Sequence, residues 1–237
     1  MSMDNAASAP AGDLSAYLQA TEFLDSDHPE VRALAARAAE GGGSQTEQAV
    51  RLYYLVRDGF LYDPYQVDIS RPGLKASTVI ARGRGYCVTK AVLLAAAARA
   101  MGVPARIGFG DVKNHIATER LKKMMGTDIF YYHGYTELFL DGRWVKATPA
   151  FNLELCTKFR VLPLEFDGKS DSLFHPFDAD NRRHMEYVLD RGPRADLPYD
   201  EIHEAMLRLY PGLNWQDGGA PGGDFAAEAA AENNPNA

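Results

Sequence analysis

Residues 83–110 read GRGYCVTKAVLLAAAARAMGVPARIGFG, and this stretch predicts a buried helix followed by a strand. Its centre, Cys87 to Met101, is dense in alanine and leucine, which favour helix, and it closes at Gly102 with Pro104 just beyond. Because apolar residues occupy nearly every side of this helix, we expect it at the centre of the protein. The strand is predicted at Ala105 to Phe109.

A hairpin is predicted downstream of this helix and strand. Two strand patterns, 130–140 and 143–148, lie on either side of Asp141-Gly142, a dipeptide typical of a tight hairpin turn. A two-residue turn places an aromatic pair and an oppositely charged pair on one face of the hairpin, which supports this register. The predicted pairs are Leu140 with Arg143, Phe139 with Trp144, Glu137 with Lys146, Tyr135 with Thr148 and His133 with Ala150.

Composition limits the class of protein. The 237 residues are 46% hydrophobic and 24% charged, as in ordinary globular domains. The longest apolar run, 92–98, is far shorter than the roughly 20 residues that a membrane helix needs, so we expect no membrane partner. A net charge of −7 argues against a nucleic-acid partner. Two cysteines and an N-terminus without a secretory pattern predict a cytoplasmic location.

The chain is predicted to form one domain, residues 14–215, with disordered tails at 1–13 and 216–237, where large apolar side chains are scarce. Residues 113–127 are predicted to form a polar loop, and residues 160–215 a wrap over the core. Further helices are expected from Pro29, capped by Asp27, to the glycines at 41–43, from Ser44 or Thr46 to Gly59, and around 182–190 and 200–210.

Cys87 is the candidate nucleophile because it begins the central helix. Unpaired N–H groups at a helix start, with the nearby charges of Arg82 and Arg84, lower a thiol pKa and can hold an oxyanion. Gly85 and Tyr86, which directly precede the cysteine, are candidate oxyanion or cleft residues. The alternative is a small buried thiol that packs the helix start.

A reactive cysteine needs a base, and His133 in the hairpin is the candidate. The alternative is a structural histidine. Its diagonal neighbours across the hairpin, Thr148 and Asn152, are positions from which a side chain can hold the second ring nitrogen. Cys156 follows no glycine turn and no clear helix start, so we expect a structural thiol there.

No metal or cofactor is expected, because the histidines and cysteines form no compact zinc pattern. The weakest alternative function is a metal site in the wrap. Its ligands would be His175, Asp178, Asp180 and His184.

The order of these parts resembles the transglutaminase-like superfamily of cysteine enzymes. In that family a Gly-x-Cys at the start of a central helix is followed by a Gly-Val-Pro-Ala-Arg strand and by a histidine hairpin, here HGYTELFLDGRWVKATP at 133–149. The resemblance covers about residues 20–152. It implies an α+β fold, a papain/transglutaminase-like core whose cysteine-bearing helix packs on an antiparallel sheet.

The resemblance also implies roles for three residues. Cys87 would be the nucleophile and His133 the general base. The third family residue is an aspartate fifteen positions after the histidine, where this chain has Thr148. A threonine hydroxyl can orient the imidazole, but it cannot stabilise an imidazolium as a carboxylate does. Asn152 is a second possibility, and an acid from the wrap is a third, with Asp167, Asp171 and Asp178 as candidates.

The leading hypothesis is a cytoplasmic, bacterial-type cysteine peptidase or amidase that acts on a peptide or protein amide through a Cys87 thioester. Hydrolysis is favoured over crosslinking by acyl transfer, because the chain lacks the large accessory β-domains of the crosslinking members. The alternative is a catalytically weak or inactive protein- or peptide-binding module. The missing aspartate motivates that alternative.

Overall fold

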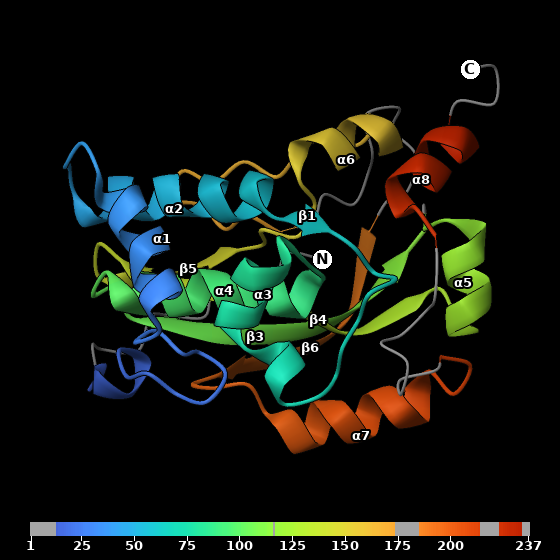
Figure 1. Cartoon of the computed structure of the whole chain (residues 1–237), viewed down its shortest axis with the longest axis horizontal. Coiled ribbons are helices and arrows are strands. Elements are labelled where there is room, and N and C mark those ends of the chain that lie inside the picture. The colour runs from blue at the N-terminus through green and yellow to red at the C-terminus, as the bar shows by residue number, and fades with distance from the viewer. Residues whose placement is uncertain (1–12, 116, 174–184, 214–222, 234–237) are drawn as a thin grey trace.

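The computed structural model describes residues 13–115, 117–173, 185–213 and 223–233 (Figure 1). Four strands form one antiparallel sheet in the order β5-β4-β3-β6, and β1 and β2 form a separate parallel pair. The fold is therefore α+β, as the sequence predicted. The elements are η1 (Ser15–Tyr17), α1 (Pro29–Ala39), α2 (Gln45–Gly59), β1 (Leu61–Tyr62), η2 (Pro72–Leu74), α3 (Ala76–Arg82), β2 (Arg84–Gly85), α4 (Cys87–Ala100), β3 (Ala105–Asn114), α5 (Glu119–Met125), β4 (Ile129–Leu140), β5 (Arg143–Ala147), α6 (Leu153–Phe159), β6 (Met185–Arg194), α7 (Tyr199–Leu209) and α8 (Phe225–Asn233).

Helix α4 lies at the centre of the molecule, packed on β3 and β4 and covered by α1, α2 and α3 (Figure 1). Every residue from Cys87 to Arg99 is buried. The Thr136 hydroxyl of β4 donates to the Ala91 carbonyl at 2.9 Å and ties the helix to the sheet. The prediction of a buried central helix is confirmed.

The predicted hairpin is confirmed in register over its five ladder pairs, from Leu140–Arg143 to Thr136–Ala147. The ladder ends there, so the two further pairs predicted, Tyr135–Thr148 and His133–Ala150, are not part of it. Pro149 explains the end: in a continued ladder it would oppose Gly134, and proline has no N–H to donate. The chain instead turns away toward α6.

Strand β6 corrects the helix predicted around 182–190. Of that range, residues 185–190 belong to β6, which pairs antiparallel with β3, and residues 182–184 lie outside the described residues. Tyr187, Val188 and Leu189 favour strand, and the backbone of β6 satisfies the hydrogen-bonding groups along β3. Strand β3 accordingly continues to Asn114, beyond its predicted end at Phe109.

Two further segments are more ordered than predicted. The polar stretch 113–127 contains α5, whose N-cap Thr118 accepts the Leu121 N–H at 3.3 Å. The predicted disordered tail is wrong for residues 225–233, which form α8. Alanine and glutamate give α8 a high helix propensity, and Phe225 packs 5.2 Å from the Phe159 ring of α6, measured between ring centroids.

The first two helices begin close to where they were predicted. Helix α1 is capped by His28, whose Nδ1 accepts the Glu30 N–H at 3.3 Å, and not by Asp27. Helix α2 begins with a capping box between Ser44 and Glu47.

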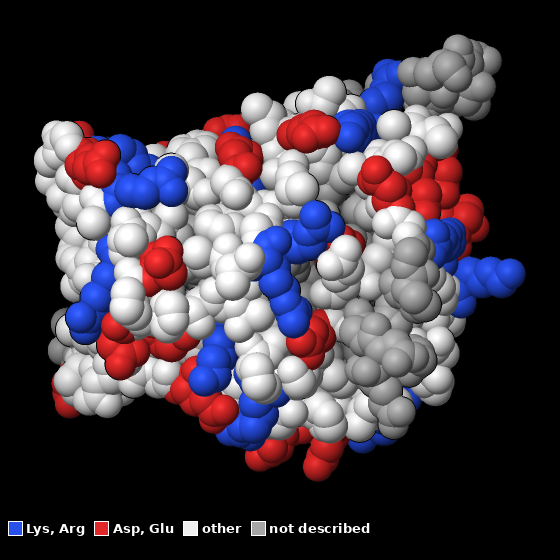
Figure 2. Space-filling model, in the orientation of Figure 1, with Lys and Arg blue, Asp and Glu red and all other residues white. Residues whose placement is uncertain are grey.

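The surface shown in Figure 2 carries basic and acidic side chains interspersed, with no large field of one sign. Along the described part of the chain, no helix has both the length and the apolar character required to cross a membrane. Helices α6 and α8 lie side by side along one side of the molecule, and α7 lies along the opposite side (Figure 1).

Candidate active site

Cys87 is the first residue of α4, and the chain reaches it through a tightly held turn. Helix α3 ends at Gly83, which adopts a left-handed φ of 65°. Arg84 and Gly85 then pair in parallel with β1, and Tyr86 is extended. The turn therefore delivers the cysteine to the helix start, as the glycine-flanked sequence predicted.

Gly134 of β4 abuts this helix start. A Cβ atom at position 134 would lie 2.8 Å from the Val88 Cα, so only glycine fits there. The Gly134 N–H donates a hydrogen bond to the Cys87 thiol. The sulfur therefore contacts the peptide unit that joins His133 to Gly134.

The ladder explains why this N–H is free to bind the thiol. The Phe139 N–H donates to the Pro104 carbonyl at 2.9 Å, on the β3 side of β4. Successive N–H groups along a strand alternate sides, so the Gly134 N–H points toward the β5 side. Strand β5 ends at Ala147, so it does not cover the edge of β4 at Gly134. The Cys87 thiol lies at this uncovered part of the edge.

The environment of Cys87 raises the thiol pKa. Burial is the main cause and brings the pKa to about 11, against the lowering effect of the Gly134, Val88 and Cys87 N–H groups. The two arginines expected to lower this pKa are paired elsewhere, Arg82 with Asp68 at 2.7 Å and Arg84 with Asp63 at 3.0 Å. The expected depressed thiol pKa is therefore wrong for this closed conformation.

His133 lies on β4 opposite Gly110 of β3 and is 2% exposed. The next residue, Gly134, faces α4, so His133 directly precedes the residue of β4 that contacts the helix start. Burial lowers the pKa of His133 to about 3. The imidazole is therefore neutral at pH 7, and burial disfavours its protonated form.

Thr148 is the first residue after β5 and is buried beside the end of the hairpin. Its carbonyl accepts the Tyr53 O–H at 3.1 Å. Its hydroxyl has no hydrogen-bond partner among the residues that the structure describes. The hydroxyl is thus available for a contact at the end of β5.

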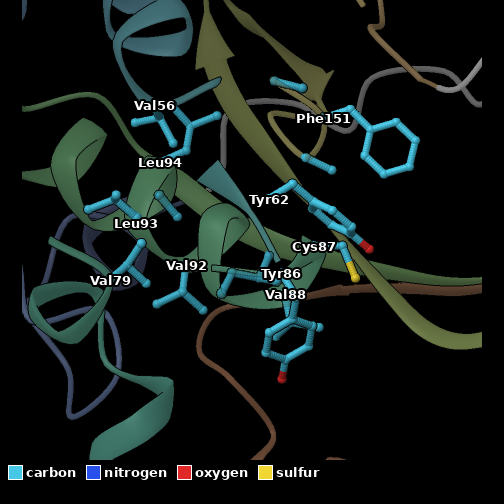
Figure 3. Close-up of a cluster of buried hydrophobic side chains, with 14 of the residues drawn as sticks. Val56, Tyr62, Val79, Tyr86, Cys87, Val88, Val92, Leu93, Leu94 and Phe151 are labelled. Carbon is cyan, nitrogen blue, oxygen red and sulfur yellow. The ribbon is translucent and has the colours of Figure 1, made fainter. Parts of the chain in front are cut away.

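Asn152 makes contacts other than the one considered for it, which was to hold the second ring nitrogen of His133. Its Oδ1 accepts the Tyr62 N–H at 3.1 Å, and its carbonyl accepts the Cys156 N–H at 3.0 Å inside α6. Asn152 therefore joins β1 to α6. This contact fixes the backbone of Tyr62, whose ring lies beside Cys87 (Figure 3).

Of the two candidate oxyanion or cleft residues, Gly85 has its carbonyl bound to the Asp63 N–H at 3.0 Å. A Cβ atom there would lie 2.6 Å from the Thr89 hydroxyl, so the glycine permits the close turn. Tyr86 contributes its ring to the wall beside the thiol. The donors around the sulfur are instead the N–H groups of Cys87, Val88 and Gly134. Sequence reasoning missed Gly134, although a glycine directly after the candidate base was a visible signal.

The candidate acids of the wrap are engaged or lie outside the described residues. Asp167 accepts the N–H groups of Lys169 and Ser170, and Asp171 accepts the Lys146 N–H at 2.9 Å. The described ranges hold no group of three or more possible metal ligands. Asp178, and the metal site considered at His175, Asp178, Asp180 and His184, lie outside the described residues.

Cys156 lies inside α6 and is 2% exposed. Its thiol faces the Phe151 carbonyl at 3.9 Å, and burial raises its pKa to about 11. It is not the first residue of its helix. These surroundings agree with the structural thiol that the sequence predicted.

Two hollows lie on either side of Tyr62. The smaller, about 60 Å³, is apolar and has Cys87 in its wall, together with residues of α5, β4 and α7. The larger, about 340 Å³, lies toward α6 and α8 and is lined by charged residues, among them Asp63 and Arg84. Figure 3 shows Tyr62 between Cys87 and Phe151. Tyr62 therefore contributes to both hollows, whereas Cys87 belongs to the apolar one alone.

The fold places Cys87, at the start of a helix, against the edge of an antiparallel sheet. The strand that it contacts also carries His133. Residues 32–149 match the family model described as the Transglutaminase-like superfamily. The chain therefore belongs to the transglutaminase-like superfamily, whose members at the family level are cysteine-dependent enzymes.

Two solved structures are similar in part. A candidate cysteine protease from Cytophaga hutchinsonii is 19% identical with a TM-score of 0.45, and the match covers 58% of this chain and 42% of that one. A candidate protease from Parabacteroides distasonis is 16% identical with a TM-score of 0.35, covering 57% of this chain and 26% of that one. This chain thus spans less than half the length of either neighbour. The comparison with curated proteins finds no match.

Proposed function

We propose that this protein is a cysteine-dependent peptidase or amidase. The observation that carries the proposal is the thiol at the start of α4, bound by the N–H of Gly134, the residue that follows His133. Backbone N–H groups of Cys87, Val88 and Gly134 stabilise negative charge at this point. Thr148 stands where the family has a carboxylate, and its buried hydroxyl, which has no partner among the described residues, would bind the imidazole once the cleft opens.

In the proposed reaction the Cys87 sulfur attacks the carbonyl carbon of an amide. His133 accepts the thiol proton and delivers it to the leaving amine as the C–N bond breaks. Water then attacks the thioester, which releases the carboxylic acid and restores the thiol. An amine in place of water would give acyl transfer from the same thioester.

Substrate entry must change the closed site. A thiol with a pKa of about 11 and an imidazole with a pKa of about 3 are both neutral at pH 7. Water that enters with the substrate relieves the burial that shifts both groups, so the two pKa values move toward each other. The reaction therefore couples opening of the cleft to proton transfer.

Alkylation tests the proposal, with Cys156 as an internal reference because burial raises the pKa of both thiols to about 11. The native protein is treated with iodoacetamide at pH 6 and the adducts are mapped by mass spectrometry. We expect selective labelling of Cys87, lost in His133→Ala and kept in His203→Ala, a change on α7. Equal slow labelling of both cysteines would refute the proposed nucleophile.

The second candidate function is an inactive peptide-binding module of the same fold. Thr148 favours it, because a hydroxyl cannot stabilise the imidazolium that forms during thioester chemistry. A panel of peptide amides separates the two functions. Release of an amine that depends on Cys87 supports the enzyme, whereas binding that is retained in Cys87→Ser without turnover of any peptide by the wild type supports the module.

A further inference from the structure

The apolar hollow beside Cys87 carries an inference about the substrate. We propose that it is the binding pocket for an apolar group next to the reacting carbonyl, and this proposal rests on the proposed function of Cys87. Its wall combines the thiol with Val67, with Leu121 and Met125 of α5, and with Met206 of α7.

The lining decides the chemical class of the occupant. None of the residues that line this pocket, all within the described part of the chain, is Asp, Glu, Lys or Arg. A charged group placed there would lose its hydration without a partner, whereas an apolar group is favoured by about 0.8 kcal/mol, or ~4-fold, for each buried methylene. The larger hollow beyond Tyr62, with Asp63 and Arg84, suits polar groups instead.

Position links the pocket to the reaction. When Cys87 bonds to a carbonyl carbon, the substituents of that carbon lie within a few bonds of the sulfur. Because the sulfur belongs to the wall of the apolar pocket and not to the wall of the larger hollow, the nearest substituent enters the apolar one. The preferred substrate therefore carries a small apolar side chain or acyl chain at this position.

Helix α7 sets the size of the pocket. The free volume of about 60 Å³ corresponds to about two water molecules at ~30 Å³ each, or a short alkyl group. Met206 of α7 and Tyr210 just after it close the pocket. The Tyr210 O–H donates to the Ile129 carbonyl at 3.1 Å and its oxygen accepts the Tyr131 N–H at 2.6 Å, so this end is firmly held. Met206 is the flexible part of the wall.

A series of chloroacetamides measures the preference. The unsubstituted reagent is compared with its N-methyl, N-ethyl, N-propyl and N-pentyl forms and with an N-(2-carboxyethyl) form close in length to N-propyl. In each reaction the S–CH₂ bond forms, the C–Cl bond breaks, chloride leaves with the electron pair, and the thiol proton passes to His133 or solvent. Adducts on Cys87 are counted relative to those on Cys156.

We expect labelling of Cys87 to rise ~4-fold per added methylene until the pocket is filled near N-propyl, and the N-(2-carboxyethyl) reagent to be at least ~10-fold slower than N-propyl. Met206→Ala should shift the best reagent toward N-pentyl. The matched control Leu207→Ala, at the neighbouring position of α7 where the side chain is exposed, should leave the order unchanged.

A measurement that needs no reactive thiol keeps the two proposals distinguishable. Wild-type protein with ¹³C-labelled methionine methyl groups is titrated with unreactive N-propylacetamide and with N-acetyl-β-alanine. We expect shifts of the Met125 and Met206 signals with the first compound only. Such shifts without Cys87 labelling would refute the proposed function and keep the pocket. A different outcome would refute the pocket alone. In that outcome unsubstituted chloroacetamide labels Cys87, the N-alkyl reagents label it no faster, and neither methionine signal shifts.

Discussion

The two cysteines differ in the residues that contact them and not in their burial. Both thiols are buried, and burial raises the pKa of each to about 11. Cys87 differs because it begins a helix and receives a hydrogen bond from Gly134 in another element. The distinction between the two thiols is therefore the N–H groups around one sulfur, and not its exposure.

Gly134→Ala tests the contact between strand and helix start. The new methyl group would lie 2.8 Å from the Val88 Cα, so α4 must shift, at an expected cost of roughly 1–3 kcal/mol in the free energy of unfolding. Gly59→Ala is the control, since a Cβ there meets nothing within 4 Å. Urea denaturation measures both variants. Equal midpoints for Gly134→Ala and the wild type would contradict this packing.

The sequence predicted the residues of this site better than it predicted their environment. Cys87 and His133 are identified by a helix start and a hairpin pattern, both of which are local. The pairing of Arg84 with Asp63 and the contact from Asn152 to Tyr62 join residues 21 and 90 positions apart. No local pattern encodes such pairs, so the thiol pKa was predicted in the wrong direction.

At the scale of elements, Lys90 fastens α4 to its neighbours. This lysine is fully buried one turn after Cys87, and its Nζ donates to the carbonyls of Arg57, Phe60 and Ala150 at 2.8, 2.6 and 2.8 Å. The ammonium thus joins the end of α2, the approach to β1 and the chain that follows β5. Burial lowers the pKa of Lys90 to about 7, and the nearby Asp58 carboxylate is the main group that opposes this shift.

Lys90→Met removes this joint while keeping much of the side-chain volume. Three backbone carbonyls, two of them in buried hydrogen bonds, lose their donor, so we expect a loss of roughly 2–4 kcal/mol in the free energy of unfolding. Lys158→Met breaks only the partly exposed pair with Glu154 and should cost less than about 0.5 kcal/mol. Thermal and urea unfolding compare the variants. Similar stabilities of the two would show that Lys90 is not a structural joint.

Elements with a strong local pattern were predictable, and elements defined by a partner were not. Helix α4 and the hairpin follow from alanine content and from Asp141-Gly142. Strand β6 forms because β3 offers an edge, and α8 is held where Phe225 packs against other aromatic rings. Neither partner is adjacent in sequence, so the same residues were predicted as helix and as disordered tail.

At the scale of the whole molecule, segments that are far apart in the sequence surround Cys87. The wall around Cys87 combines the chain after β1, helix α5, the start of β4, and Met206 and Tyr210. His133 is also buried, and burial of the two proposed catalytic groups shifts their pKa values apart. The stability of the closed molecule should therefore depend on pH.

His133 makes that dependence measurable. Its pKa is about 3 in the folded protein and about 6.5 when unfolded, so between these values the unfolded chain binds more protons. As the pH falls below about 6.5, His133 therefore lowers the free energy of unfolding by about 1.4 kcal/mol per pH unit. Above about pH 6.5 it causes no such loss. Urea unfolding at pH 7 and pH 5 should show about 2 kcal/mol more loss for the wild type than for His133→Gln. Parallel losses would contradict a buried neutral histidine.

The sequence by itself determined the central helix, the hairpin and its register, the α+β class and the two residues proposed for catalysis, because helix propensity, turn chemistry and residue order are local properties. Tertiary structure alone decided that Gly134 binds the thiol, that Asn152 and the two arginines have other partners, and that an apolar pocket closes over Cys87. These features depend on burial and on contacts between residues far apart in the chain, and desolvation in the assembled core, not composition, sets the charge state of the site.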